Sequence, residues 1–179
     1  AHAKVRQLVI EGPLLDRDSF AQIQQAEGLR SQFVSLQMPA DPDLQGDSPV
    51  VLQALGKTLV ASVERICAEA EQAVRGGAAL VVLSDMDALD ADHALVPPLL
   101  ATSAVHQHLI TCGLRQSCGI IVASGEIREV MHVTVLLGFG AGAVYPWLAL
   151  ETVANIARGN SVDIGGVRCG FLGRQAQCL

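Results

Sequence analysis

The strongest constraint on this chain is the alternation of short apolar runs and helical patterns in its second half. The apolar runs lie at 78–83 (AALVVL), 119–122 (GIIV) and 143–145 (AVY), and helical patterns follow them at 97–112, 127–137 and 148–157. Glycines at 76–77, 113, 138 and 159 mark the breaks between elements. This order predicts an α/β fold of alternating βα units, with a mostly parallel sheet and right-handed crossovers.

The 179 residues are expected to form a single domain, 1–179, with three parts. Residues 1–47 are irregular, although Asp16 or Asp18 suits the start of a short helix and 32–38 alternates like a strand. Residues 48–159 form the βα-repeat core, which opens with a long helix capped by Ser48 and Pro49. Residues 160–179 form a tail in which we expect little order. Because the chain starts at Ala1 and its end has little pattern, we expect a piece of a longer protein.

Composition excludes several functions. A net charge of −6 and only 3% aromatic residues argue against nucleic-acid binding. No Asp, Glu, Lys or Arg occurs between Glu129 and Glu151, a stretch of membrane-spanning length. Three glycines and a proline interrupt it, so a buried helix, a turn and a buried strand explain it better, and we expect no membrane association. Five scattered cysteines and no signal peptide indicate a cytoplasmic protein.

Several polar patterns favour structural roles. The acidic segment SDMDALDADH, with Asp85, Asp87, Asp90 and Asp92, lacks the ligands of a calcium loop and fits a solvated loop. His106 and His108 point to different sides of a helix and cannot share a metal, and His106 and His132 fit hydrogen-bonded core histidines. Cys112 and Cys118 lack a third thiolate for an iron–sulfur cluster. The glycines of LGFGAG follow a helix, whereas a dinucleotide site needs them to follow a strand.

The turn ASGEIREV, residues 123–130, has the shape of a phosphate cup between a strand and a helix. Glu126 stands where such a cup usually has a second glycine. Its carboxylate suits the helix dipole but repels a phosphate. We therefore expect Glu126 to act as an internal anion and the turn to bind neither FMN nor phosphate. Replacing Glu126 by Gly should, on this hypothesis, improve anion binding.

This part of the chain resembles the phosphate-binding end of flavin and inosine-phosphate barrels. The resemblance lies in the order of its parts: a strand, the motif S-G-x-I-R, a helix, the motif G-x-G-A and a second strand. Together with ICAEAEQAVRGGA, LVVLSD and the run from VPPLLATS to YPWLALE, this arrangement resembles the central domain of the glutamate synthase large chain, ferredoxin- or NAD(P)H-dependent. The likeness is strong over residues 66–157. It implies a degenerate partial flavin-type (βα) barrel. The sequence departs from the family pattern at Met86, Met131 and the segment 145–148.

The resemblance implies a parent enzyme that converts 2-oxoglutarate and glutamine reductively to two glutamates. An amidotransferase domain and a flavin domain of the same chain, with FMN and a 3Fe-4S cluster in the latter, would be the partners of this segment. The segment itself is expected to be non-catalytic, with no catalytic, cofactor-binding or metal residue, and to position those domains for ammonia transfer. A stand-alone flavin- or phosphate-binding half-barrel is the alternative.

The candidate functional residues are those at the carboxyl ends of the strands, where ligands and partners meet parallel sheets. We predict an interdomain contact at Ser84, Asp85, Ser124, Glu126 and Arg128. The core is predicted to include Leu83, Ile121, Val122, Leu136 and Val144.

Overall fold

The computed structural model describes residues 8–26, 28–40, 48–87 and 93–158, and the backbone alone of 162–164, 167–172 and 175–178. Its centre is a sheet of four parallel strands in the order β1-β3-β5-β6. These strands are β1 (Ser31–Ser35), β3 (Leu80–Ser84), β5 (Gly119–Ala123) and β6 (Ala143–Tyr145). The segment before the first helix extends this sheet beyond β6, because Leu14 forms a parallel bridge with Val144.

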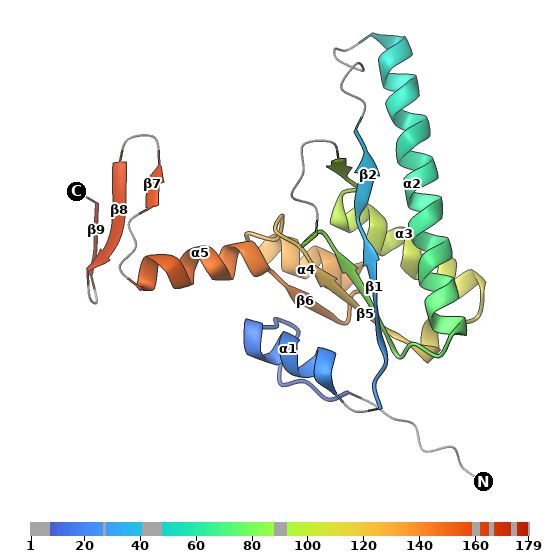
Figure 1. Cartoon of the computed structure of the whole chain (residues 1–179), viewed down its shortest axis with the longest axis horizontal. Helices are drawn as coiled ribbons and strands as arrows, with labels where there is room; N and C mark the ends of the chain where they lie inside the picture. Colours follow the sequence, from blue (N-terminus) through green and yellow to red (C-terminus); the bar gives the residue numbers. More distant parts are fainter. Residues whose placement is uncertain are drawn as a thin grey trace.

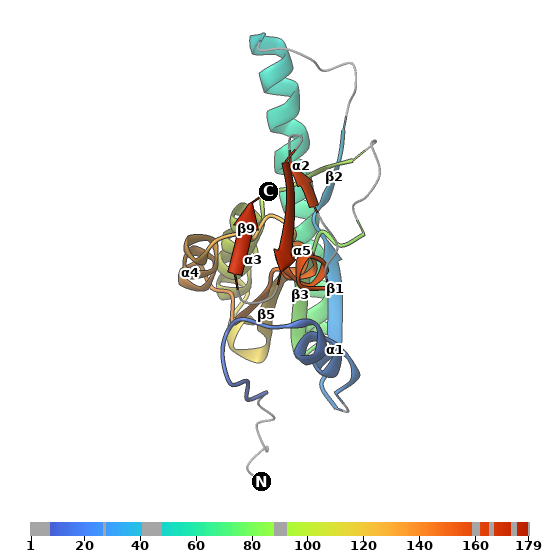
Figure 2. The ribbon, with the colours of Figure 1, turned by 90° about the vertical axis from the view of Figure 1, so that its left-hand side faces the viewer.

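A helix follows each strand of the central sheet (Figure 1). These helices are α2 (Pro49–Arg75), α3 (Pro98–Thr111), α4 (Val130–Gly138) and α5 (Trp147–Ala157). The hydroxyl of Ser48 accepts from the Val51 N–H at 3.3 Å, and Pro49 occupies the first turn of α2, as the sequence predicts. The first half of α2 extends past the sheet (Figure 2).

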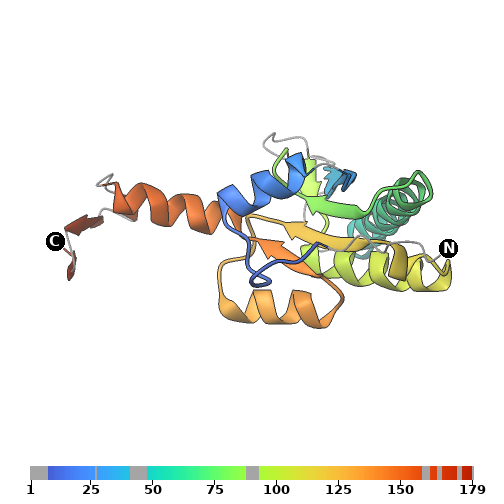
Figure 3. The same ribbon diagram turned by 90° about the horizontal axis from the view of Figure 1, so that it is seen from below.

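The sheet has an apolar core on each face. The residues that face α2, α3 and α4 form the larger core, which includes Val81, Leu83, Ile120, Val122 and Val144. On the other face, helix α1 (Arg17–Gln25) brings Phe20 and Ile23 onto Val82, Ile121 and Tyr145, and the Phe20 ring stacks on Tyr145 at 4.4 Å. Figure 3 shows α1 and α4 on opposite sides of the sheet.

The remaining elements are short. Strands β2 (Gln37–Pro39) and β4 (His93–Leu95) pair antiparallel, and a 3-10 turn, η1 (Arg115–Ser117), precedes β5. Strands β7 (Val162–Ile164), β8 (Val167–Leu172) and β9 (Gln175–Cys178) form an antiparallel sheet of their own. The division into parts ending at residues 47, 159 and 179 stays a prediction.

The predicted α/β class and parallel sheet are confirmed. Neighbouring strands are also successive in the chain, which is the order of a (βα) barrel, but the sheet of the described residues stays open. All five predicted core residues, Leu83, Ile121, Val122, Leu136 and Val144, are at most 3% exposed. Asp16 is the residue that caps α1, through a bond from the Ser19 N–H at 2.8 Å.

Three details of the sequence prediction are wrong. The strand expected at 32–38 is divided at Leu36, which bonds to Ser84 and Val96 and turns the chain from one sheet to another. Helix α4 begins at Val130 instead of residue 127, and of its own residues Leu136 alone is buried. The stretch without charges is therefore a largely exposed helix, a buried strand and the start of α5. Across the described residues, no helix is long and apolar enough to span a bilayer.

Candidate functional site

The predicted contact residues gather at the carboxyl ends of β3 and β5. Ser84 is the last residue of β3, and Asp85 follows it directly. Because Ser84 lies opposite Ala123 in the parallel register, Asp85 and Ser124 leave the sheet side by side. Glu126 and Arg128 lie farther along the loop that leads from β5 to α4.

The carboxylate of Asp85 is the centre of this site. It accepts from the Ser124 hydroxyl at 2.5 Å, the Gly125 backbone N–H at 3.0 and 3.1 Å, and the Trp147 indole N–H at 2.8 Å. Asp85 is 4% exposed and Ser124 is fully buried. A buried carboxylate is tolerated when donors surround it, and here two donors from the loop after β5 and one from the first residue of α5 converge on one group.

Asp85, and not Glu126, is therefore the internal anion of the turn. The backbone N–H that a phosphate would need, that of Gly125, is already bound to Asp85. Glu126 has an exposed side chain, and its backbone N–H donates to the Ser124 hydroxyl at 3.1 Å. The solvated-loop interpretation of the acidic segment is wrong for Asp85. It fits the exposed Asp87, while Asp90 and Asp92 lie outside the described residues.

The helix-dipole argument for Glu126 is also wrong. Glu129 is the residue before α4, in an extended conformation, so Glu126 lies outside the helix. The favourable field of a helix N-terminus falls off within its first turn. The side chain of Glu129 does not cap α4, and the Arg128 backbone N–H donates to the Nδ1 of His132 at 3.2 Å.

Close packing favours glycine at position 125. A Cβ there would lie 3.2 Å from the Trp147 ring and 3.3 Å from the Leu148 Cβ. A side chain at residue 125 would therefore press on the ring whose N–H donates to Asp85. The sequence places Trp147 at a strand end but did not lead us to include it in the predicted site, although its indole N–H was a usable signal.

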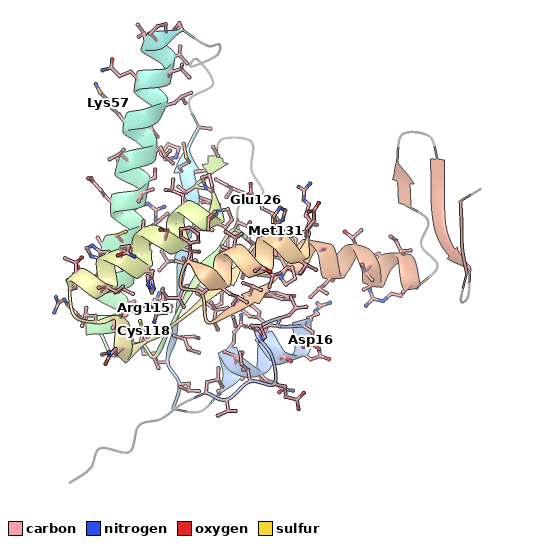
Figure 4. The ribbon with its side chains drawn as sticks, turned by 180° about the vertical axis from the view of Figure 1, so that it is seen from behind. Asp16, Lys57, Arg115, Cys118, Glu126 and Met131 are labelled. Carbon is pink, nitrogen blue, oxygen red and sulfur yellow. The ribbon has the colours of Figure 1, made fainter. Side chains whose placement is uncertain are left out.

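A cleft of about 450 Å³ opens beside the turn. It lies between the start of α3 and α4, and Figure 4 shows Glu126 in this region. The lining residues are Pro97, Pro98, Leu99, Glu126, Ile127, Arg128, His132, Val135 and Leu136. The five predicted contact residues thus fall into two groups: Ser84, Asp85 and Ser124 are buried, whereas Glu126 and Arg128 are exposed at the cleft.

A second polar cluster lies near the amino ends of β5 and β6. The guanidinium of Arg115 donates to the Nδ1 of His106 at 2.9 Å and to the backbone oxygens of Cys118 and Gly140, both at 2.8 Å. Burial, and then the charge of Arg115, lower the pKa of His106. The predicted hydrogen bond of His106 is confirmed, but its ring is only partly buried and so lies outside the core. The core position predicted for His132 is wrong, because that residue is exposed, although its ring accepts a hydrogen bond.

Of the glycines of LGFGAG, Gly140 belongs to this cluster. Gly140 has φ = 112°, and a Cβ there would overlap the His106 ring. Helix α4 precedes these glycines, as the sequence predicts. Cys67, Cys112 and Cys118 are free thiols, and Cys67 and Cys118 are buried.

Another grouping escaped sequence reasoning. Glu71 of α2 and His108 and Cys112 of α3 place one potential ligand atom each within 4.8 Å of one another. The spacing of four between His108 and Cys112 was visible in the sequence, but nothing indicated that Glu71 packs beside them. His106 and His108 have different partners and do not come together.

The sequential strand order and the helix after each strand define an α/β domain with the strand order of a partial (βα) barrel, and the turn at its strand ends is filled by the protein's own carboxylate. The family described as "Glutamate synthase central domain" matches residues 1–172, so this chain belongs to the glutamate synthase central domain family.

Named relatives agree with this assignment. The chain is 42% identical over 121 residues to "Glutamate synthase (NADPH) large chain" of Bacillus subtilis, and the matched segment covers 68% of this chain and 8% of the relative. It is 34% identical over 147 residues to "Ferredoxin-dependent glutamate synthase" of Cyanidium caldarium, with coverages of 82% and 9%. A third relative, "Ferredoxin-dependent glutamate synthase 2, chloroplastic" of Arabidopsis thaliana, is 36% identical over 149 residues. The matched part of this chain spans less than a tenth of each relative, 8%, 9% and 8%.

Proposed function

We propose that this domain is a non-catalytic connecting part of a glutamate synthase. In this role it holds an amidotransferase domain and a flavin domain of the same chain at a fixed separation. Ammonia released from glutamine can then reach 2-oxoglutarate, which is reduced to glutamate with FMN and a 3Fe-4S cluster of the flavin domain. Membership of the central domain family supports the proposal that the domain is part of a glutamate synthase. The turn filled by Asp85 supports the proposal that this part is not catalytic.

The observation that carries this proposal is the set of hydrogen bonds that Ser124, Gly125 and Trp147 donate to the Asp85 carboxylate. In a flavin-type barrel the donors of such a turn hold a ligand phosphate. Here the same donors hold a side chain of the domain, and a second anion would be repelled at that distance. The residues of the turn therefore do not fit FMN. Nor do the described thiols fit an iron–sulfur cluster, because the one group of potential ligands among the described residues contains a single cysteine.

The exposed part of the site supports a contact with a neighbouring domain. Glu126 and Arg128 present opposite charges beside the apolar residues Pro97, Leu99 and Val135 of the cleft. A mixed apolar and charged surface of this kind suits an interface within a chain, where charged groups fix the register. Ser84, Asp85 and Ser124 contribute by holding the loop that carries Glu126 and Arg128.

The experiment compares coupled and uncoupled activities in the full-length enzyme. Arg128→Ala should lower glutamine-dependent glutamate synthesis more than the glutaminase activity measured without the other substrates. Synthesis from added ammonia should be retained, since the flavin domain is unchanged. Arg17→Ala, an exposed arginine on α1, is the matched control and should leave all three activities unchanged. Equal losses in all activities, following a loss of stability, would contradict an interdomain role for Arg128.

A further inference from the structure

Helices α2 and α3 carry a cluster of three metal-ligating side chains that the connecting function does not use. Glu71 lies in the last turns of α2, and His108 and Cys112 lie at the end of α3. Their nearest ligand atoms are all within 4.8 Å of one another. All three side chains are half-buried, so the group is reachable from solvent. Figure 4 shows Cys118 and Arg115 near this end of α3, opposite the end that lies by Glu126.

The fold fixes the three residues relative to each other. His108 and Cys112 are four residues apart and therefore lie on one face of the helix, with Cys112 Sγ 3.7 Å from His108 Nε2. The facing helix supplies Glu71, whose Oε2 lies 2.7 Å from the same nitrogen. The three ligand atoms thus come from two helices and the C-cap residue of one of them, and helices hold a site more accurately than loops do.

A fourth residue supports the carboxylate from behind. The Nε of Arg75 donates to Glu71 Oε1 at 2.8 Å and leaves Oε2 directed at His108. Ligating carboxylates in metal sites are themselves hydrogen-bonded in this way, which fixes the direction of the free oxygen. Arg75 is thus a positioning residue and not a ligand.

A thiolate, an imidazole and a carboxylate form a ligand set typical of zinc. Zn²⁺ binds sulfur, nitrogen and oxygen at about 2.0–2.3 Å, and sites with three protein ligands keep a fourth position for water. Tetrahedral geometry at these lengths places the ligand atoms about 3.3–3.6 Å apart. The sulfur–nitrogen distance of 3.7 Å already fits, and the oxygen–nitrogen distance of 2.7 Å needs to open by less than an ångström. Ca²⁺ and Mg²⁺ do not suit a site with sulfur and nitrogen.

We propose that Glu71, His108 and Cys112 form a Zn²⁺ site that joins the ends of α2 and α3. The ion binds Glu71 Oε2, His108 Nε2 and Cys112 Sγ, and water completes the tetrahedron. Binding displaces the thiol proton of Cys112 to solvent and replaces the Glu71–His108 hydrogen bond. Because the ion binds the folded helix pair, it stabilises the packing of α2 on α3. The site lies away from the loop of Glu126 and Arg128 and does not depend on the proposed connecting function.

The test uses Co²⁺ as a coloured substitute for Zn²⁺. Titration of the purified protein should give one equivalent of four-coordinate Co²⁺, seen as strong visible d–d bands and a sulfur-to-cobalt charge-transfer band. Zn²⁺ should then displace the colour. Cys112→Ser should abolish the charge-transfer band, and Cys112→Ser and His108→Gln should each weaken binding by about 100-fold or more. Arg75→Ala should weaken it by about 10–100-fold.

Matched substitutions elsewhere separate ligation from a general loss of structure. Cys118→Ala removes a buried thiol and His132→Gln an exposed imidazole, and both should leave Co²⁺ binding unchanged. A second measurement needs no variant: one equivalent of Zn²⁺ should slow the alkylation of Cys112 in the wild-type protein. Absence of the charge-transfer band with unprotected Cys112 would overturn the proposal, and would leave Glu71–His108 as a hydrogen bond between helices.

Discussion

The parallel strands of the central sheet end on one side, called here the carboxyl edge, and begin on the opposite side, called here the amino edge. A charged side chain holds the surrounding segments together at each, and the two charges have opposite signs. At the carboxyl ends of β3 and β5, the anion Asp85 accepts from a hydroxyl, a backbone N–H and an indole N–H. At the amino ends of β5 and β6, the cation Arg115 donates to a ring nitrogen and two backbone oxygens. In each case one charged side chain satisfies three groups, which come from two segments at Asp85 and from three at Arg115, and so holds separate parts of the chain together.

The charged side chains at the two edges differ in burial, and this difference determines how much stability a substitution at each is expected to cost. Asp85 is almost completely buried, while Arg115 is only partly so. Water can replace part of what Arg115 provides, but it cannot easily reach the donors around Asp85. We therefore expect substitutions at the carboxyl edge to cost more stability, and the following predictions are ordered on that basis.

The largest effect should follow Asp85→Ala. It leaves the donors of Ser124, Gly125 and Trp147 without their acceptor, and each buried donor left unsatisfied costs about 1–3 kcal/mol. The free energy of unfolding, measured by urea denaturation, should fall by roughly 3–5 kcal/mol. Asp87→Ala, two residues along and exposed, should change it by less than about 0.5 kcal/mol.

A small anion should rescue Asp85→Ala. Formate is the missing carboxylate and can occupy the space that three donors still line, so its binding should restore part of the lost stability. The wild-type protein should show no such dependence on formate. If formate stabilised both proteins equally, the donors would not be directed at the Asp85 position.

The next largest loss of stability is expected from a substitution in the apolar core, where no charge is involved. Ile121→Ala removes a side chain that is 3% exposed on the α1 face of β5, and should cost roughly 2–5 kcal/mol. Formate should give no rescue here, since no donors are left unpaired. A loss below about 0.5 kcal/mol, typical of surface sites, would place Ile121 outside the core.

Much of this fold is visible in the sequence because its signals are local. Ser48 and Pro49 start α2 and Gly76–Gly77 end it, as expected from capping chemistry. The apolar runs become the buried strands β3, β5 and β6 within two residues of the expected bounds. Helix α4 was placed too early because Ile127 is apolar and fits the helical period, yet it is buried from the preceding loop.

The candidate site was less predictable because its bonds join distant residues. Asp85 lies 39 positions from Ser124 and 62 from Trp147, and these residues meet only through the register of three strands. The sequence correctly located the strand ends but assigned the internal anion to Glu126, the nearest carboxylate along the chain. The Arg115 cluster was missed for the same reason, since Gly140 lies 25 positions away.

A smaller loss is expected from Arg115→Lys at the amino edge. Arginine reaches three acceptors with its planar fork, whereas a lysine ammonium is a single point that cannot span them. The partial exposure of Arg115 lets water satisfy the freed oxygens, so the cost should be roughly 1–2 kcal/mol, below that of Asp85→Ala. A loss equal to that of Asp85→Ala in urea denaturation would remove the distinction between the two edges.

The His106 ring should give the amino edge a modest pH dependence. Its pKa in the folded protein is lowered from 6.5 by burial and by Arg115, so the unfolded chain binds the proton more readily. The contribution of His106 is thus complete above pH 6.5 and is lost as the pH falls through 6.5 and toward the lower folded value. His106→Gln keeps an acceptor for Arg115 but cannot titrate, so its unfolding free energy should fall less steeply over this range. Parallel curves for the two proteins would contradict this.

The smallest effect is expected at Glu126, and it separates the two carboxylates that compete for the role of internal anion. If Glu126 were the group that keeps anions out of the turn, Glu126→Gly would create a site for FMN or phosphate. In the structure the Gly125 N–H and the Ser124 hydroxyl are bound to Asp85, and neither bond involves the side chain of residue 126. Titration with FMN, followed by flavin fluorescence, should therefore show no saturable binding near micromolar concentrations for either the wild type or Glu126→Gly. Saturable binding by the variant alone would return the role to Glu126. Binding by the wild type would instead favour a flavin half-barrel over a connecting domain.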